Sequence, residues 1–173
     1  MNRPAWAEAS DLMRDYYDHE WGRPVRDTPG VYERIVLEGL QSGLSWAVVL
    51  RKRPAFRQAF DGFDPAVVAR YTEADIERLL ADPGIVRNRR KVEAAITNAR
   101  ATAAMTDAGV DLAELVWSFR PDDPRAGADA TESAESLALS KALKKHGFLF
   151  VGPVTMFALM QAIGILEHRE PTA

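Results

Sequence analysis

The stretch Lys141-Ala-Leu-Lys-Lys-His-Gly-Phe-Leu-Phe-Val-Gly-Pro-Val-Thr155 joins two helical patterns through a short apolar turn, which is bracketed by Gly147 and Gly152. Gly152 stands where the second helix begins, so successive backbone N–H groups are expected to point outward. Such N–H groups at a helix N-terminus bind anions without basic side chains, and DNA phosphate is one such anion. A simple corner between two helices with glycine caps fits the same spacing, although the basic residues 144–146 favour a phosphate site.

Helical patterns continue on both sides of this hairpin. Helices are expected at residues 31–42, 45–53, 88–105, 111–119, 133–146 and 152–166, with short ones opened by Asp64-Pro65 and by Thr72. Pro54 is expected to end the second helix, and residues 121–135 predict a surface loop. No stretch alternates with period two, so the predicted class is all-α. We expect one domain over residues 1–173, with the hairpin at about 140–165 pinned to the core by Phe148 and Phe150.

The composition excludes several function classes. Because the chain has no cysteine, disulfides, thiolate metal sites and iron–sulfur clusters are excluded, and its three histidines are not expected to form a zinc site. No apolar run reaches the roughly 18 residues that a membrane span needs, and the N-terminus lacks the apolar segment of a signal peptide. We therefore expect a cytoplasmic protein without a membrane contact. The sequence also lacks nucleotide-binding glycine motifs, nucleophile elbows and zinc-protease motifs.

The distribution of charge favours a DNA contact more than the total charge does. A net charge of −3 argues against a protein that coats nucleic acid. Basic residues nevertheless cluster at 51–53, 87–91 and 141–146. Each cluster alone fits a solvated helix face, but three clusters around one domain favour a phosphate-binding face.

Glu38 follows Val31 by seven residues and Ile35 by three, which places it on the apolar stripe of its helix. Burial of a carboxylate is costly unless hydrogen-bond donors surround it. Glu38 is therefore either paired with a backbone amide or an arginine, or faces a cavity in which a ligand supplies the donors. Further on, Gly43 sets Leu44 at the tip of a turn, where a leucine is either an ordinary exposed side chain or a wedge for a base stack.

Aromatic residues are dense near the N-terminus. Three of the four tryptophans lie within the first 46 residues, together with two adjacent tyrosines: Trp6, Tyr16, Tyr17, Trp21 and Trp46. These side chains fit a hydrophobic core cluster, and beside a buried carboxylate they also fit a pocket for a flat, electron-poor ring. Which interpretation holds depends on where Glu38 points.

Taken together, these residues resemble the 3-methyladenine DNA glycosylase I family. The similarity keeps one order and spacing from Trp6 to Gly164, and several of its motifs are long and rich in tryptophan and glycine. The matching stretches are Tyr16 with Asp18-His-Glu-Trp-Gly22, Leu37-Glu-Gly39, Gln41, Gly43-Leu-Ser-Trp46, Gly84-Ile-Val-Arg-Asn-Arg89 with Lys91, Trp117-Ser-Phe119, Leu139-Ser-Lys-Ala-Leu-Lys-Lys145, Gly147-Phe with Phe150-Val-Gly152, and Met160-Gln-Ala162 with Gly164.

The resemblance implies a helix-hairpin-helix DNA glycosylase fold of two small helical lobes with the base pocket between them. It implies that Glu38 and Tyr16 are catalytic and hydrogen-bond the excised base. Trp46 is expected to stack on that base, and Trp6 and Trp21 are expected to line the pocket. The implied DNA-binding residues are those of a turn that fills the gap left by the flipped nucleotide, Gln41, Gly43 and Leu44, and those of the hairpin, Lys144, Gly147, Phe150, Val151 and Gly152.

The implied activity is that of a monofunctional glycosylase, which flips 3-methyladenine out of double-stranded DNA and hydrolyses its N-glycosidic bond in base excision repair. The positive charge of the alkylated adenine makes it a good leaving group, and no cofactor is called for. A monomer is expected, and Glu167 is the candidate general base. Two alternatives stay open: a non-catalytic binder of damaged DNA, and a glycosylase with a shifted range of alkylated bases. A lyase needs an amine nucleophile beyond the hairpin, where Pro153-Val154-Thr155 offers none.

The sequence departs from the family's pattern at a metal site. The family usually holds a structural zinc through two cysteines and two histidines near both termini, whereas the N-terminal positions here read Pro4 and Tyr17. We therefore expect no metal, and a tether between the termini that is formed by packing, with Tyr17 among the replacements. A pocket position that is often tyrosine reads Met13, and residues 165–168 also depart from the usual pattern.

Overall fold

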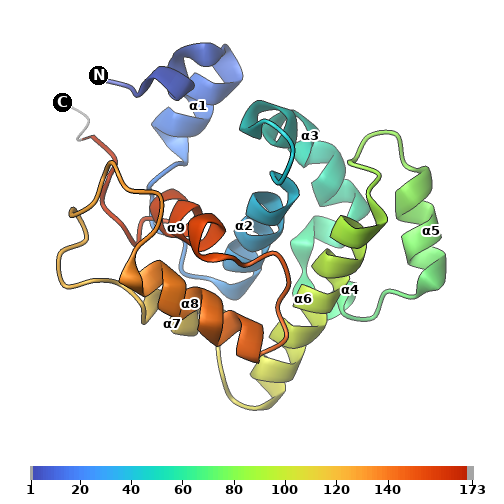
Figure 1. Ribbon diagram of the computed structural model, residues 1–173. Coiled ribbons are helices and arrows are strands. Elements are labelled where there is room, and N and C mark those ends of the chain that lie inside the picture. Colours follow the sequence, from blue (N-terminus) through green and yellow to red (C-terminus); the bar gives the residue numbers. More distant parts are fainter. Residues whose placement is uncertain (1, 171–173) are drawn as a thin grey trace.

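The computed structural model describes residues 2–170, and over this range the chain forms helices without a β-strand (Figure 1). The predicted all-α class is confirmed. Met1 and residues 171–173, the ends of the expected single domain, lie outside the described residues. The elements are η1 (Ala5–Ala9), α1 (Asp11–His19), α2 (Thr28–Leu40), α3 (Trp46–Ala59), η2 (Asp61–Phe63), α4 (Pro65–Val68), α5 (Glu73–Ala81), α6 (Arg89–Asp107), α7 (Leu112–Trp117), α8 (Ala134–Lys145) and α9 (Pro153–Ala162).

Local capping explains where most helices begin. Seven helices start behind a side chain that accepts a hydrogen bond from a backbone N–H of the first turn: Ser10, Asp27, Ser45, Asp64, Asn88, Asp111 and Ser133. Helix α5 starts at the expected Thr72 with a capping box, in which the N–H of Thr72 donates to Asp75 at 2.8 Å. Such caps satisfy donors that a helix leaves free at its N-terminus. The starts expected from the sequence agree with these caps, except that the sequence predicts no helix at α1 and that α2 begins at Thr28 rather than at residue 31.

Two predicted helix ends are wrong. Helix α3 runs through Pro54 to Ala59, although proline removes a hydrogen bond from the helix interior. The helix continues because Phe56 and Ala59 beyond the proline are buried in the core. Helix α9 stops at Ala162 rather than near residue 166, since Gly164 has a φ of +81° and turns the chain back.

Helices α2 and α9 form the centre of the molecule. Nine of the thirteen residues of α2 are buried, and this helix packs against α3, α6, α7 and α9, while α8 covers α9. Figure 1 shows α1 at one edge and α5 at the opposite edge, with α2 and α9 between them. Among residues 2–170 no helix has the length and apolar character needed to cross a membrane.

Candidate functional site

A cavity of about 280 Å³ opens between the N-terminal elements η1 and α1 and the central helices α2, α3 and α9. Its position agrees with the expected pocket between two helical parts of the fold. The side chains that line it are Trp6, Met13, Tyr16, Trp21, Glu38, Gln41, Trp46, Ala158 and Gln161. All five residues predicted for the base pocket are among them.

Glu38 lies in the last turns of α2 and is only 7% exposed. Among residues 2–170 no group donates a hydrogen bond to its carboxylate; the structure therefore excludes the interpretation in which an amide or an arginine pairs with it. Burial raises the pKa of Glu38 to about 8, because a desolvated carboxylate is less stable than the neutral acid. The side chain faces the cavity and lacks the donors or positive charge that a ligand there can supply.

Tyr16 supplies a hydroxyl to the same cavity from helix α1, one turn from Met13. Burial raises the pKa of Tyr16, and the negative charge of Glu38 raises it further. The phenol therefore stays protonated and can donate its O–H to a ligand. The pocket thus pairs an acceptor from α2 with a donor from α1.

The aromatic rings line the cavity, and they also pack against a small hydrophobic cluster of Met13, Tyr16 and Leu50. The centroids of Trp6 and Trp21 are 5.6 Å apart, with an interplanar angle of 69°. Tyr16 and Trp46 are 5.7 Å apart and inclined at 53°. Tyr17 is the exception, because it stacks on Trp21 at 5.4 Å but does not line the cavity. Faces of electron-rich rings around a carboxylate suit a flat cationic ligand.

Sequence reasoning misses part of the lining. Ala158 and Gln161 come from α9, and Gln161 also contacts the side chain of His168, with 2.9 Å between Nε2 and Nδ1. A signal is present in the sequence, because Gln161 is a polar residue within the apolar stretch 153–166. Gln41 lines the pocket as well, although the sequence assigns it only to the turn.

The turn after α2 has the geometry expected for a projecting loop. The N–H of Leu44 donates to the carbonyl of Gln41 at 2.8 Å, and Gly43 between them has a φ of +77°, a conformation that favours glycine. Nothing lies within 4 Å of the Cβ that a side chain at Gly43 would add. Leu44 is partly buried, so it is not fully extended into solvent.

The hairpin between α8 and α9 also has the expected form. Phe148 and Val151 are buried, whereas Leu149 is 48% exposed. Gly152 precedes α9 as its N-cap. The N–H groups of Gly152, Val154 and Thr155 have no acceptor among residues 2–170, as an anion site at a helix N-terminus requires.

The three basic clusters have different environments. Arg53 of the first cluster is buried, and it donates to Glu20 at 2.7 Å and to Glu33 at 2.9 Å. The prediction that this cluster belongs to a phosphate face is therefore wrong for Arg53. The third cluster ends α8 with exposed Lys144 and Lys145, directly before the hairpin. In the second, exposed Arg90 lines a groove of about 360 Å³ beside the hairpin.

The residues at the family's metal positions do not fit a zinc ion. Pro4 has no donor atom, the hydroxyl of Tyr17 accepts a hydrogen bond from the N–H of Glu170 at 3.3 Å, and His168 is bound to Gln161. Within residues 2–170 no group of three His, Cys, Asp or Glu side chains could hold a metal.

Arg169 forms the tether between the terminal segments. Its guanidinium donates to the carbonyl of Asp18 at 2.8 Å, to that of Trp21 at 2.9 Å and to that of Tyr17, and it also lies over the Tyr17 ring. Tyr17 takes part as expected, but hydrogen bonds to the end of α1, and not packing alone, make the connection.

Glu167 is not placed to act as the general base. It does not line the pocket, and its carboxylate is paired with Arg120 and Arg125. The hydrogen bond from Arg120 lowers the pKa of Glu167, against the effect of desolvation. Glu38 is the carboxylate that the described pocket contains.

Comparison with known proteins agrees with this geometry. A sequence model of methyladenine glycosylases matches residues 6–173. The DNA-3-methyladenine glycosylase of Haemophilus influenzae is 42% identical over 96% of this chain and 94% of its own length, and DNA-3-methyladenine glycosylase 1 of Escherichia coli K12 is 44% identical over 98% and 94%. A solved structure of a variant 3-methyladenine DNA glycosylase I in complex with 3-methyladenine has 34% identity and a TM-score of 0.87, over 95% of this chain and 92% of that one.

Proposed function

The chain belongs to the methyladenine glycosylase family, and we propose that its aromatic cavity receives 3-methyladenine flipped out of DNA and that Glu38 reads the base there. The enzyme is a DNA-3-methyladenine glycosylase, which hydrolyses the N-glycosidic bond of the damaged base in DNA repair. The residues of the cavity serve both parts of that reaction, recognition of the base and cleavage of its bond to the sugar.

Recognition of the base rests on the unpaired carboxylate. The edge of 3-methyladenine presents an exocyclic amine, whereas guanine presents a carbonyl at the same place, so an acceptor at Glu38 favours adenine. The positive charge of the alkylated ring also favours ionised Glu38 and lowers its pKa from about 8 towards the usual range. Tyr16 donates a hydrogen bond from helix α1, and Trp6, Trp21 and Trp46 supply aromatic rings.

Catalysis needs little acid–base help, because the cationic base is already a good leaving group. Contacts that are stronger in the transition state than in the ground state lower the barrier. Glu38 offers such a contact, since it stabilises positive charge beside the breaking bond in a desolvated cavity. A water molecule then attacks the sugar carbon. Glu38 is the one carboxylate of the described cavity. We therefore assign to Glu38 the role of general base, for which Glu167 is not placed.

Binding of duplex DNA uses the two other elements. We assign Leu44, with Gln41 and Gly43, to the gap that the flipped nucleotide leaves, because an apolar wedge offsets part of the unstacking cost. The free N–H groups around Gly152, with Lys144 beside them, are assigned to a phosphate of the backbone. Gly147, Phe150 and Val151 shape that hairpin.

We infer a monomer acting on double-stranded DNA in the cytoplasm, close to the nucleoid, with residues 1–173 as one domain.

One observation favours a second candidate, a shifted range of alkylated bases. Met13 occupies the wall of the cavity, and its flexible thioether adapts to ligands of different shape. Larger N3-alkyl groups are then accepted beside the methyl group. A lyase activity finds no support, because Pro153, Val154 and Thr155 offer no amine.

The observation that carries the proposal is the buried, unpaired Glu38 in an aromatic cavity. Its test is the release of free 3-methyladenine from methylated duplex DNA, measured by chromatography of the released bases. We expect multiple turnovers without added metal or cofactor. A protein that binds methylated DNA but releases no base would instead be the non-catalytic binder. Competition among DNA substrates with methyl and larger alkyl groups decides the range.

A further inference from the structure

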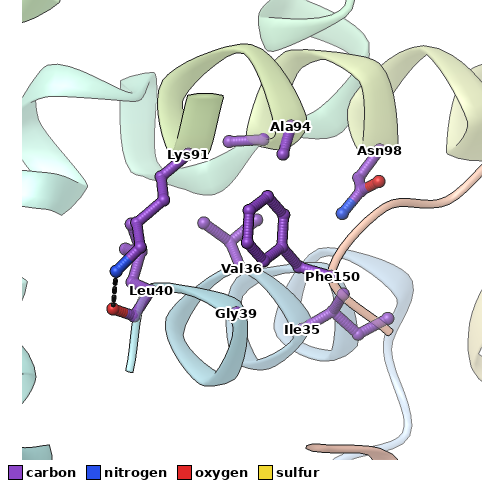
Figure 2. A pocket seen from close by; sticks show the side chains of 9 residues that line it. Ile35, Val36, Gly39, Leu40, Lys91, Ala94, Asn98 and Phe150 are labelled. Carbon is purple, nitrogen blue, oxygen red and sulfur yellow. Dashed lines mark hydrogen bonds between the residues drawn. The ribbon is translucent and has the colours of Figure 1, made fainter. Parts of the chain in front are cut away.

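Lys91 reaches from the first turn of α6 to the end of α2. Its Nζ donates a hydrogen bond to the carbonyl oxygen of Leu40 at 2.9 Å, drawn in Figure 2, and another to the carbonyl oxygen of Ser42. Leu40 is the last residue of α2, where carbonyl groups lack partners within the helix and a cation is favoured by the helix dipole. Because the Ser42 carbonyl belongs to the peptide bond with Gly43, Lys91 fixes the turn just ahead of Leu44.

Asn98 makes the corresponding contact on the other side of the same helix face. It lies seven residues after Lys91, which is about two helical turns, and it is 3% exposed. Its Oδ1 accepts a hydrogen bond from the N–H of Leu149 at 2.8 Å, and its Nδ2 donates to the carbonyl of the same residue at 3.0 Å. A buried amide with both ends bonded holds one orientation. Asn98 therefore fixes the backbone of the hairpin tip.

Phe150 lies between these two contacts, and we call Lys91, Asn98 and Phe150 together the frame. Figure 2 shows its ring between α2 and α6, with Lys91 on one side and Asn98 on the other. A Cβ at Gly39 would lie 3.2 Å from the Cβ of Phe150, so the absent side chain at Gly39 allows the hairpin to approach α2 closely. Phe150 itself has a φ of +58°, which non-glycine residues adopt only where their surroundings hold them.

From this frame we propose that Lys91 and Asn98 are positioning residues, which hold the 41–44 turn and the 147–152 hairpin at a fixed separation so that both engage the duplex at once. The proposal rests on the proposed roles of these two elements in DNA binding. A wedge that can shift relative to the phosphate anchor enters the base stack less often, and excision from duplex DNA then slows. Neither residue lines the base cavity, so recognition of the free base does not depend on them.

The decisive variant is Lys91→Met, which keeps the length of the side chain but removes both hydrogen bonds. Single-turnover excision of 3-methyladenine from duplex DNA is expected to fall about tenfold, and excision from single strands, where no stack must be filled, by less than about twofold. Affinity for free 3-methyladenine is expected to stay at the wild-type value. Lys91→Arg retains the positive charge and the donors and is expected to restore most of the duplex rate.

Arg100→Met is the matched control. Arg100 belongs to the same helix, and it donates to the carbonyls of Ala69 at 3.1 Å and of Tyr71 at 2.7 Å, away from the turn and the hairpin. Its loss removes a contact of the same kind and is expected to leave the ratio of duplex to single-strand excision unchanged. A Lys91→Met enzyme that shows the same ratio as Arg100→Met would overturn the positioning role.

A direct contact between Lys91 and DNA phosphate is distinguished by salt. Loss of one phosphate contact reduces the slope of log affinity against log salt by about 0.9 on duplex DNA. We expect the slope for undamaged duplex to stay unchanged in Lys91→Met, and a reduced slope would overturn the proposal. Thermal unfolding of each variant confirms that the protein is folded before rates are compared.

Two further variants separate this proposal from the function on which it rests. Leu44→Ala combined with Lys91→Met is expected to lose no more duplex activity than Leu44→Ala alone, because Lys91 acts through the turn. If Leu44→Ala excises from duplex DNA at the wild-type rate, the wedge itself is refuted. If Leu44→Ala is impaired and Lys91→Met is not, the wedge stands and the positioning role fails.

Asn98→Leu is expected to weaken duplex binding while free-base affinity stays normal, and unchanged duplex binding by the folded variant contradicts the positioning role of Asn98.

Discussion

Glu33 and Glu38 are two buried carboxylates on one helix, five residues apart, and their surroundings differ completely. Glu33 accepts hydrogen bonds from Arg57 at 2.7 Å, Arg53 at 2.9 Å and Arg34 at 3.2 Å. Burial acts to raise the pKa of Glu33, but the hydrogen bonds from Arg57 and Arg53 outweigh it and leave the pKa below its usual value. Glu38 has no such donor, and its pKa rises to about 8. The first carboxylate serves the fold, and the second is available to a ligand.

The same substitution at both positions tests this division. Glu33→Gln leaves Arg57 without its anion and buried Arg53 with Glu20 alone, and removing one partner of a buried ion pair costs about 3 kcal/mol or more. We expect the free energy of unfolding in urea to fall by that amount, while excision by the folded protein changes less than about threefold. A stable Glu33→Gln protein would show that the ion pairs contribute little to the fold.

Glu38→Gln is expected to act on the reaction instead of the fold. The amide replaces one acceptor oxygen with a donor, which opposes the amine edge of the base, and the loss of a charged hydrogen-bond partner costs about 2 kcal/mol. Excision of 3-methyladenine should slow by about 10- to 100-fold, free 3-methyladenine should bind poorly, and affinity for undamaged DNA should stay normal. Wild-type excision and free-base affinity in this variant would place the base pocket elsewhere.

The pH dependence of stability sharpens the comparison. The folded-state pKa of Glu38 is raised to about 8 from an ordinary value of 4.5. The contribution of Glu38 to the free energy of unfolding is therefore present below the ordinary pKa and is lost as the pH rises towards 8. The slope is at most about 1.4 kcal/mol per pH unit. Urea unfolding between pH 5 and 8 should show Glu38→Gln gaining stability relative to wild type as the pH rises. A constant difference would mean that Glu38 is not held in a desolvated site.

Glu33 is expected to show the opposite dependence. Because the pKa of Glu33 is lowered, its contribution to the free energy of unfolding is present above the ordinary pKa of a glutamate. That contribution is lost as the pH falls through the folded-state pKa. The stability difference between wild type and Glu33→Gln should therefore shrink in acid, where the Glu38 variant shows no gain. Parallel profiles for the two variants would contradict the assignment of one carboxylate to the fold and the other to the site.

Arg169 gives the smallest expected effect. It is a paired polar group next to the cavity wall, so it should behave as Glu33 does, and Arg169→Ala should lower the free energy of unfolding by about 1 kcal/mol.

A metal chelator should leave thermal unfolding unchanged, and metal analysis should find no stoichiometric zinc. One tightly bound zinc per chain would show that the tether is not the one formed by Arg169 and Tyr17.

Much of the fold and of the site can be predicted from the sequence, because the signals are local. Helix caps act within three residues, which is why the predicted starts at Asp64, Thr72 and Asn88 are confirmed. The position of Glu38 on an apolar stripe depends only on its spacing from Val31 and Ile35. The aromatic set near the N-terminus can also be found, although the residues alone fit a core cluster equally well.

Tertiary structure decided which of these groups have partners. Arg53 looks like part of a basic face in the sequence, but contacts with Glu20 and Glu33, separated from it by 33 and 20 residues, bury it in ion pairs. Burial of Phe56 carries α3 through Pro54, and pairing with Arg120 takes Glu167 out of consideration as a base. Spacing along the chain gives the face on which a side chain lies. Only the fold determines whether a hydrogen-bond donor lies against that face, because the donors come from distant segments that pack against it.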